Sequence, residues 1–257
     1  MSTFSTHRKS GGTAAYPQIG ELFQDNYSLL FEGEQEAEFD QDILDIGTNT
    51  NLSISYWIKC NNLDSRQYVI SGAANLFGQR MDASLNVANK PQFTLALNIM
   101  TSVSQISNTE IDDDSWHHVL WSHDRDGASV IYIDGSEDDS EALTDNSSSN
   151  VDISGAGYVG RNAWSALESY KLHGYVNDIA IWNEALSASD ASAIYSSGTP
   201  NDLTNSASYH TDRTSNLLVY WRMEENTGTT IADESGNGIT LSFGSGGAAP
   251  SWSSETP

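Results

Sequence analysis

Basic residues are scarce in this chain of 257 residues, which has 11 lysines and arginines against 35 aspartates and glutamates. The formal net charge of −24 argues against nucleic-acid binding and against docking on anionic lipid, because both partners require a basic face. Three interpretations of the acidity remain: calcium ligands, solubility in salty surroundings, or a match to a basic partner. We expect most of these acids to form a solvated anionic surface.

Cysteine and long apolar stretches are also nearly absent. Cys60 is the single cysteine and ends the strand-like run "LSISYWIKC", which excludes an internal disulfide framework and predicts a half-buried packing position. No run of about 18 or more apolar residues occurs, so no membrane insertion is expected. The polar N-terminus lacks the apolar segment of a secretory signal. We therefore expect a chain made without the general secretory route, or one from which a signal has been removed.

Signatures of repeats and of two catalytic classes are missing as well. No period of roughly 20–50 residues is found, which excludes a repeat array. Neither a Gly-x-Ser-x-Gly elbow nor a phosphate-binding loop occurs. A single β-sandwich of this length is ordinary, and it needs no disulfide or metal to hold its core.

The chain does contain a long succession of short alternating runs. In "YSLLF" (27–31), the apolar residues Tyr27, Leu29 and Phe31 share one face. Similar runs follow between clusters of Gly, Asn, Asp and Ser: "LSISYWIK", "QYVISG", "PQFTLALNI", "WHHVLWSHD", "SVIYIDG", "YVNDIAIW" and "LLVYWRM". Many short strands separated by turn signals predict an all-β sandwich or barrel.

One segment has the pattern of a helix. In "ALSASDASAIYSSG", Ser187 suits the N-cap, Asp190 the third helical position and Gly198 the end. Leu186 and Ala191 occupy the positions of a hydrophobic staple. These signals predict a short helix near 188–196.

Four segments resemble one family in their order and spacing. "SWHHVLWSHDRDGASVIYIDGSEDD" resembles the central hairpin of laminin-G-like, concanavalin A-type jelly rolls, with an Asp-Gly turn and a strand ending in Tyr-x-Asp-Gly. "YSLLFEGEQEAEFD" resembles their opening strand, "LDIGTNTNLSISYWIK" a strand that ends in an aromatic residue, and "LHGYVNDIAIWNEALSASDASAIYSSG" the closing strand and helix. The resemblance covers roughly 27–198 and implies a two-sheet antiparallel jelly-roll sandwich.

The predicted organisation has three parts: an extended N-terminal arm at 1–26, a jelly-roll domain at 27–243, and a flexible tail at 244–257. The segment "LLVYWRMEENTGTTIADESGNG" resembles a strand and turn that often precede such domains, yet it follows the helix here. Because jelly-roll termini lie side by side, we expect 217–243 to complete the domain from the C-terminal side. Trp252 is unusual in so polar a tail and is interpreted as an anchor onto another surface.

The hairpin histidines raise the question of a metal site. His117 and His118 are adjacent, so a strand places them on opposite faces, and His123 lies about 20 Å farther along the strand than His117. With no cysteine nearby, a packing or hydrogen-bonding role is favoured over zinc.

Acidic residues alternate along one early strand, where Glu34, Glu36, Glu38 and Asp40 share a face. This segment resembles the Glu-x-Asp-x-x-Glu strand of jelly-roll glucanases, and Glu38 and Asp40 fit that pattern. Ile43 stands at the last position, so one of the two catalytic carboxylates is missing. We therefore predict no catalytic residues.

A calcium site is a stronger prediction than a zinc site or a catalytic site. The resemblance implies a structural calcium at the edge of the sandwich, and the matching positions are Asp178, Asp233 and Asn237. Oxygen-rich Asp, Asn and Gly turns suit this ion. The alternative is that Asp233 begins an Asx turn and that Asp178 accepts backbone N–H bonds.

The segment "GRNAWSALESYKLHG" is the predicted ligand-binding loop. Arg161, Trp164 and Tyr170 combine aromatic surface with polar donors, which a sugar face requires. The alternatives are that Trp164 packs over the rim of the sandwich or against a neighbouring subunit.

These features together predict a non-catalytic binding or assembly module. The most specific reading is a bacteriophage virion protein, a capsid decoration or a tail or fibre component, because the resemblance extends to standalone phage versions. Its expected partners are other virion proteins, identical subunits and host cell-surface polysaccharide. A glycan-processing enzyme of the jelly-roll glucanase type and a bacterial surface or secreted lectin are the alternatives.

Overall fold

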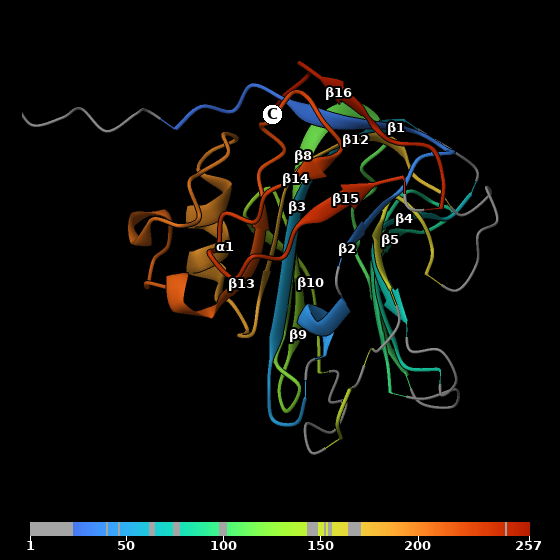
Figure 1. The fold of residues 1–257 in the computed structure, drawn as a ribbon. Coiled ribbons are helices and arrows are strands. Elements are labelled where there is room, and N and C mark those ends of the chain that lie inside the picture. Colours follow the sequence, from blue (N-terminus) through green and yellow to red (C-terminus); the bar gives the residue numbers. More distant parts are fainter. Residues whose placement is uncertain are drawn as a thin grey trace, which may run out of the picture.

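Two antiparallel β-sheets pack face to face in the computed structural model, with one helix outside the first sheet (Figure 1). The structure describes residues 23–39, 41–45, 47–61, 65–73, 78–97, 102–142, 149–151, 153, 156–163, 171–244 and 246–257. The predicted all-β antiparallel jelly-roll sandwich is confirmed. No helix among these residues has the length and apolar character needed to cross a membrane.

The first sheet has the strand order β10-β9-β8-β3-β12-β1-β16, and β13 also pairs with β12. Its strands are β1 (Ser28–Glu32), β3 (Leu52–Asn61), β8 (Asp113–His123), β9 (Ser129–Ile133), β10 (Ser136–Glu141), β12 (His173–Trp182), β13 (Leu217–Trp221) and β16 (Ser251–Ser253). The long β3 and β8 pair from Leu52 opposite His123 to Asn61 opposite Asp113.

The second sheet has the order β14-β15-β2-β11-β4-β5-β6-β7. Its strands are β2 (Ala37–Phe39), β4 (Gln67–Ala73), β5 (Arg80–Leu85), β6 (Pro91–Ala96), β7 (Ser102–Ile106), β11 (Gly157–Val159), β14 (Thr230–Ile231) and β15 (Leu241–Phe243). Residues 217–243 thus contribute strands to both sheets.

The main core fills the space between the sheets, because the apolar residues of the alternating runs point inward from both. Phe93 of the second sheet stacks on Trp121 of the first, with ring centroids 5.1 Å apart. The rings of Phe39 and Trp221 also meet in this core, in a tilted arrangement with centroids 4.9 Å apart. Cys60 is buried in this core and donates to the Ile111 carbonyl oxygen.

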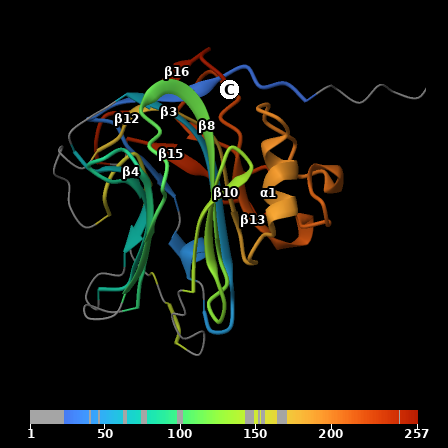
Figure 2. The same ribbon diagram turned by 180° about the vertical axis from the view of Figure 1, so that it is seen from behind.

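Helix α1 (Ala188–Tyr195) covers the outer face of the first sheet (Figure 2). Ser187 and Asp190 form the predicted capping box. Leu186, Ala191 and Ile194 bury against a second apolar cluster beneath the helix. The helix ends at Ser196, which has a φ of 50° and takes the left-handed position expected of Gly198. Short 3-10 turns η1 (Gln41–Leu44), η3 (Ser206–Ser208) and η4 (Thr214–Asn216) connect other elements.

The hairpin segment forms β8 and β9 around the turn at Asp126 and Gly127, as predicted. His118 is buried beside Trp57 and Tyr195, with ring centroids at 5.1 and 6.3 Å. His117 Nδ1 lies 2.9 Å from an Asp134 carboxylate oxygen. The two histidine rings therefore lie in different surroundings, although the backbone N–H of His118 also donates to Asp134.

Both ends of the described chain meet at one end of the first sheet (Figure 1). The C-terminal segment differs from the predicted flexible tail, since β16 pairs with β1 and the Trp252 ring packs on Phe243 at 5.7 Å. Strand β1 provides an otherwise unpaired edge, and Trp252 provides the apolar contact that holds β16 there. Residues 1–22 of the predicted arm lie outside the described residues, whereas Phe23 lies against the Arg222 guanidinium.

Candidate functional site

The outer face of the second sheet carries a line of polar side chains. Residues paired directly across neighbouring strands place their side chains on the same face. One such line crosses all eight strands through Thr230, Ser242, Glu38, Tyr158, Ser71, Asp82, Thr94 and Ser104. The neighbouring residues along each strand point the other way into the core. We call this outer surface the polar face.

Hydrogen bonds organise one half of the polar face. Arg66 donates to Gln92 Oε1 at 2.6 Å, and Gln92 Nε2 donates to Ser104 Oγ at 2.9 Å. The Thr94 and Ser104 hydroxyl oxygens are 3.2 Å apart. This network links Arg66, which precedes β4, to side chains of the adjacent strands β6 and β7.

Asp82 occupies the middle of the polar face and is 3% exposed. Its Oδ2 accepts from Arg80 Nε at 2.9 Å, whereas its Oδ1 has no hydrogen-bond partner in the described part of the chain. Burial raises the pKa of Asp82 to about 7, against the opposing effect of Arg80. Because buried acceptors are nearly always satisfied, an unpartnered oxygen at this position is unusual.

Two tyrosines lie on the polar face, of which Tyr68 is buried and Tyr158 is partly buried. Tyr68 lies near Asp82, and burial is the main factor that raises the pKa of its phenol. Tyr158 lies in the polar line, and the Arg161 guanidinium is 4.0 Å from its ring centre. Flat rings beside hydrogen-bonding groups are typical of sugar-binding surfaces.

Arg161, one of the predicted ligand-binding residues, lies beside the polar face. It donates to both carboxylate oxygens of the buried Glu36, at 3.0 and 3.2 Å. Its carbonyl oxygen accepts from Ser71 Oγ at 2.7 Å. Trp164 and Tyr170, the other two predicted contacts, lie outside the described residues.

Sequence reasoning did not single out Arg66, Tyr68, Arg80 or Asp82. The available signal was the alternation in "RMDASL" and "PQFTLA", where polar residues take every second position. That pattern locates an outward face. It does not show that polar residues from eight separate strands become neighbours, because strand order and register decide this.

The predicted calcium ligands fall into two groups. Asp233 Oδ1 accepts from the backbone N–H groups of Tyr220 and Ser235, each at 2.9 Å. Asn237 Nδ2 donates to the carbonyl oxygens of Leu217 and Leu218. These bonds hold the turn against β13, which is the arrangement that the Asx-turn alternative describes.

Asp178 has different surroundings. It is buried, its Oδ1 accepts from the Tyr220 phenol at 2.5 Å, and its Oδ2 has no partner in the described part of the chain. Asp178 and Asp233 therefore lie at opposite ends of Tyr220, one at its hydroxyl group and one at its backbone nitrogen. A free, buried carboxylate oxygen suits a hard cation.

Asp25 accompanies Asp178 in this region. Burial, and secondarily the charge of Asp25, raise the pKa of Asp178 well above its usual value. Burial also raises the pKa of Asp25 to about 7, although Asn177 donates to Asp25 Oδ1 at 2.7 Å. The described residues hold no cluster of three or more His, Cys, Asp or Glu side chains placed to bind a metal.

Two of the three glucanase-like positions lie among the described residues. Glu38 lies in the polar line on β2, Asp40 lies outside the described residues, and Ile43 lines a cavity that shares no residue with the polar face. The Glu36 carboxylate forms an ion pair with Arg161.

Comparison with known proteins supports one family. No curated protein sequence matches the chain. Among solved structures, a Bacteroides ovatus protein assigned to carbohydrate binding superimposes with a TM-score of 0.61 at 14% identity, over 89% of this chain and 62% of its own. The chain thus spans less than two thirds of that protein.

Two further structures share the fold at a similarly low sequence identity. The heptameric SAP-like pentraxin of Limulus polyphemus gives a TM-score of 0.54 at 14% identity, over 86% of this chain and 96% of its own. Domains LG4-5 of the mouse laminin alpha1 chain superimpose with a TM-score of 0.51 at 13% identity. The match covers 69% of this chain and 48% of the laminin chain. The family model for the concanavalin A-like lectin/glucanases superfamily matches residues 31–192, more than half of the chain. The chain belongs to the concanavalin A-like lectin/glucanases superfamily.

Proposed function

We propose that this protein is a non-catalytic glycan-binding module that holds a carbohydrate chain on the polar face. The observation that carries the proposal is the line of polar side chains across eight strands, with the unpartnered Asp82 Oδ1 near its middle. Sugar hydroxyl groups both donate and accept hydrogen bonds, so they need both kinds of partner. The Arg66 and Gln92 network supplies donors, and Asp82 supplies an acceptor.

The spacing of carboxylates favours binding over hydrolysis. Glu38 and Asp82 are three strands apart in the polar line, which corresponds to about 14 Å. Glycosidase carboxyl pairs lie roughly 5–9.5 Å apart. Glu36 is nearer to Glu38 along the strand, but its carboxylate is buried and paired with Arg161.

A binding experiment with matched variants tests the proposal. We expect a panel of neutral and acidic polysaccharides to contain a ligand that binds without release of reducing ends. Asp82→Asn should weaken that binding at least about tenfold, because an amide replaces the carboxylate acceptor. Asp114→Asn makes the same chemical change at an exposed position and should leave the affinity unchanged.

Two outcomes would contradict the proposal. Equal affinity of Asp82→Asn and the unmodified protein would show that any glycan binds elsewhere. Turnover of a polysaccharide would overturn the non-catalytic assignment, and Glu38→Gln would then identify whether Glu38 acts.

We also propose that Asp178 binds a structural calcium, which would supply positive charge beside the buried Asp178 and the partly buried Asp25. The free Oδ2 of Asp178 and the nearby Asp25 support this proposal. Calcium should raise the melting temperature of the unmodified protein and leave that of Asp178→Asn unchanged. A melting curve that is identical with calcium and with a chelator would exclude the site.

The bacteriophage virion assignment remains a proposal that rests on the order of sequence segments. It predicts that the protein is found in purified particles and that neighbouring genes encode capsid or tail proteins. Neighbouring polysaccharide enzymes would favour the alternative of a bacterial surface lectin.

A further inference from the structure

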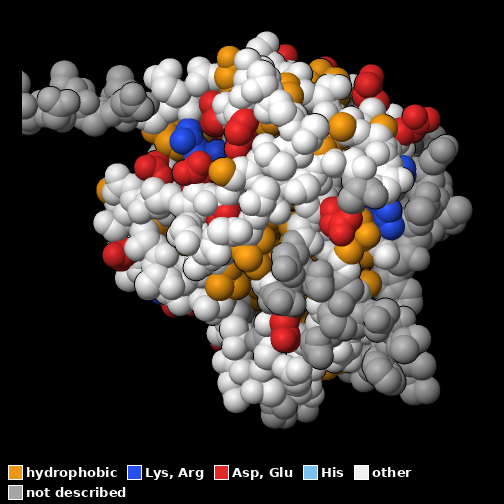
Figure 3. Space-filling model, in the orientation of Figure 1, with side chains coloured by type: hydrophobic (Ala, Val, Ile, Leu, Met, Phe, Trp, Pro, Cys, Tyr) orange, Lys and Arg blue, Asp and Glu red, His pale blue; other side chains and the backbone are white. Residues whose placement is uncertain are grey.

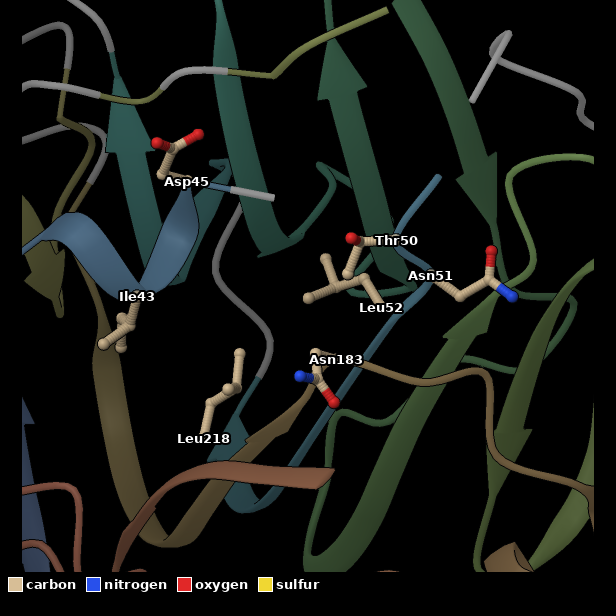
Figure 4. A pocket seen from close by; sticks show the side chains of 7 residues that line it. All are labelled: Ile43, Asp45, Thr50, Asn51, Leu52, Asn183 and Leu218. Atoms are coloured by element: carbon tan, nitrogen blue, oxygen red, sulfur yellow. The ribbon is translucent and has the colours of Figure 1, made fainter. Parts of the chain in front are cut away.

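A separate cavity of about 250 Å³ opens beside the first sheet, where β3 begins and β12 ends. Its lining consists of Ile43, Asp45, Thr50, Asn51, Leu52, Asn183 and Leu218 (Figure 4). Figure 3 shows apolar side chains at the surface in the region between β13 and β2. The cavity shares no residue with the polar face. It is smaller than the roughly 300–1,000 Å³ of pockets that hold drug-sized ligands, so its occupant is a small group.

The walls of the cavity are aliphatic. Figure 4 shows Ile43 and Leu218 on one side, and Leu52 on the other. Ile43 and Leu218 are only partly buried, although both pack on the main core. These side chains offer an apolar surface to a methyl-sized group.

One directed donor lies at the edge of this apolar surface. Asn183 Oδ1 accepts from Asn216 Nδ2 at 3.0 Å, which fixes the orientation of the Asn183 amide. Its Nδ2 makes no hydrogen bond within the described residues and lies on the side of Leu218 (Figure 4). The carboxamide is therefore held ready to donate to a carbonyl oxygen in the cavity.

An acceptor complements this donor. The Thr50 side chain extends into the same space (Figure 4), and its hydroxyl donates to the Thr48 carbonyl oxygen at 3.3 Å. The same oxygen keeps lone pairs that can accept a hydrogen bond. Asn51 points away from Ile43 and Leu218, and its Oδ1 is used by the Arg125 backbone N–H.

The lining also excludes several ligand classes. None of the seven described lining residues is basic, so a phosphate, sulfate or uronate group would have no counter-charge beside Asp45. None is aromatic, so the flat face of a sugar ring has nothing to stack on. A neutral group with a methyl, one acceptor and one donor fits what remains.

We propose that this cavity binds the acetamido group of an N-acetylated amino sugar. The methyl group lies among Ile43, Leu52 and Leu218, the carbonyl oxygen accepts from Asn183 Nδ2, and the N–H donates to Thr50 Oγ1. The sugar hydroxyl groups remain at the opening, near Asp45. This site goes beyond the polar face and does not depend on it.

Titration with two matched probes tests the proposal: the methyl β-glycosides of N-acetylglucosamine and of glucose, which differ only at the second ring carbon. We expect the N-acetylated glycoside to bind at least about tenfold more tightly. Asn183→Asp should weaken it at least about tenfold, because a carboxylate cannot donate to the acetamido oxygen. Asn226→Asp, the same change at an exposed position, should have no effect.

Backbone amide NMR spectra would show that each variant is folded and would map the shifted residues. Equal binding of the two glycosides, no binding of either, or full affinity of Asn183→Asp would overturn the proposal. Asp82→Asn separates the two sites, since it should retain glycoside binding even where polysaccharide binding is lost. Retained polysaccharide binding in Asp82→Asn would instead contradict the polar-face proposal alone.

Discussion

Asp82 should lower the stability of the fold at neutral pH, and removing its charge should raise it. Its pKa increases from 3.8 to about 7 on folding, mainly through burial. An acid whose pKa is raised by folding contributes stability that is fully present below pH 3.8 and is lost as the pH rises through 7. One pKa unit corresponds to about 1.36 kcal/mol, so the ionised carboxylate costs about 4 kcal/mol above pH 7.

The test is Asp82→Asn, measured by urea denaturation at pH 4 and pH 8. An amide has nearly the same shape and no charge, so it avoids this cost. It also loses the charge interaction with the partly exposed Arg80, which offsets part of the gain. We expect the variant to be about 1–4 kcal/mol more stable than the unmodified protein at pH 8, and the difference to shrink towards zero at pH 4.

The difference between the two proteins isolates Asp82 from other titrating groups. Asp25 also has a pKa of about 7, but it is present in both proteins and cancels. Asp114→Asn, the same chemical change at an exposed position, is the control. If Asp82→Asn were less stable at pH 8 than the unmodified protein, the buried carboxylate would be a stabilising group and the argument would fail.

Four further changes test the packing and the turns. Burial lowers the pKa of His118 from 6.5 to about 4, so the free energy of unfolding should fall as the pH drops below 6.5. His118→Phe should remove about 2 kcal/mol of that loss between pH 7 and pH 4.5, measured by urea denaturation. Gly160→Ala should cost about 3 kcal/mol in the same assay, because φ is +90° and a Cβ would lie 2.4 Å from the Phe31 ring. Asp233→Ala should lower stability by about 2 kcal/mol equally with and without calcium, and a calcium-dependent loss would contradict its role in the turn. Trp252→Ala should cost about 1–2 kcal/mol, whereas an unchanged melting temperature would show that β16 adds nothing.

The fold was predictable because its signals are local. Alternation in each short run fixes which residues face the core, and the Asp-Gly turn at 126–127 fixes the central hairpin. The capping box at Ser187 and Asp190 is likewise written in four consecutive residues. The tail was predicted to be flexible from its composition, whereas the pairing of β16 with β1 depends on an edge that exists only in the assembled sheet.

The candidate site was harder to predict because its members are distant in sequence. Arg161 was found from a cluster within one loop. Asp82 lies in a run that looks like ordinary scaffold, and only the pairing with Ser71 and Thr94 places it in a polar line. Asp178 was found from the resemblance, but its grouping with Asp233 was not realised, since one bonds the hydroxyl of Tyr220 and the other its backbone.

Asp82 and Asp178 are both exceptions to the rule that buried polar atoms have hydrogen-bond partners. Their surroundings differ, and the surroundings decide what each can bind. Both are buried carboxyls with one oxygen that has no partner in the described part of the chain, which burial makes costly. Asp82 has Arg80 beside it, so its free oxygen needs only a neutral donor such as a hydroxyl group. Asp178 lies near a second acid, Asp25, and two like charges are relieved by a cation, which a neutral hydroxyl cannot replace. The two asparagine variants should therefore differ in kind: Asp178→Asn should lose calcium stabilisation and keep polysaccharide binding, and Asp82→Asn should do the reverse.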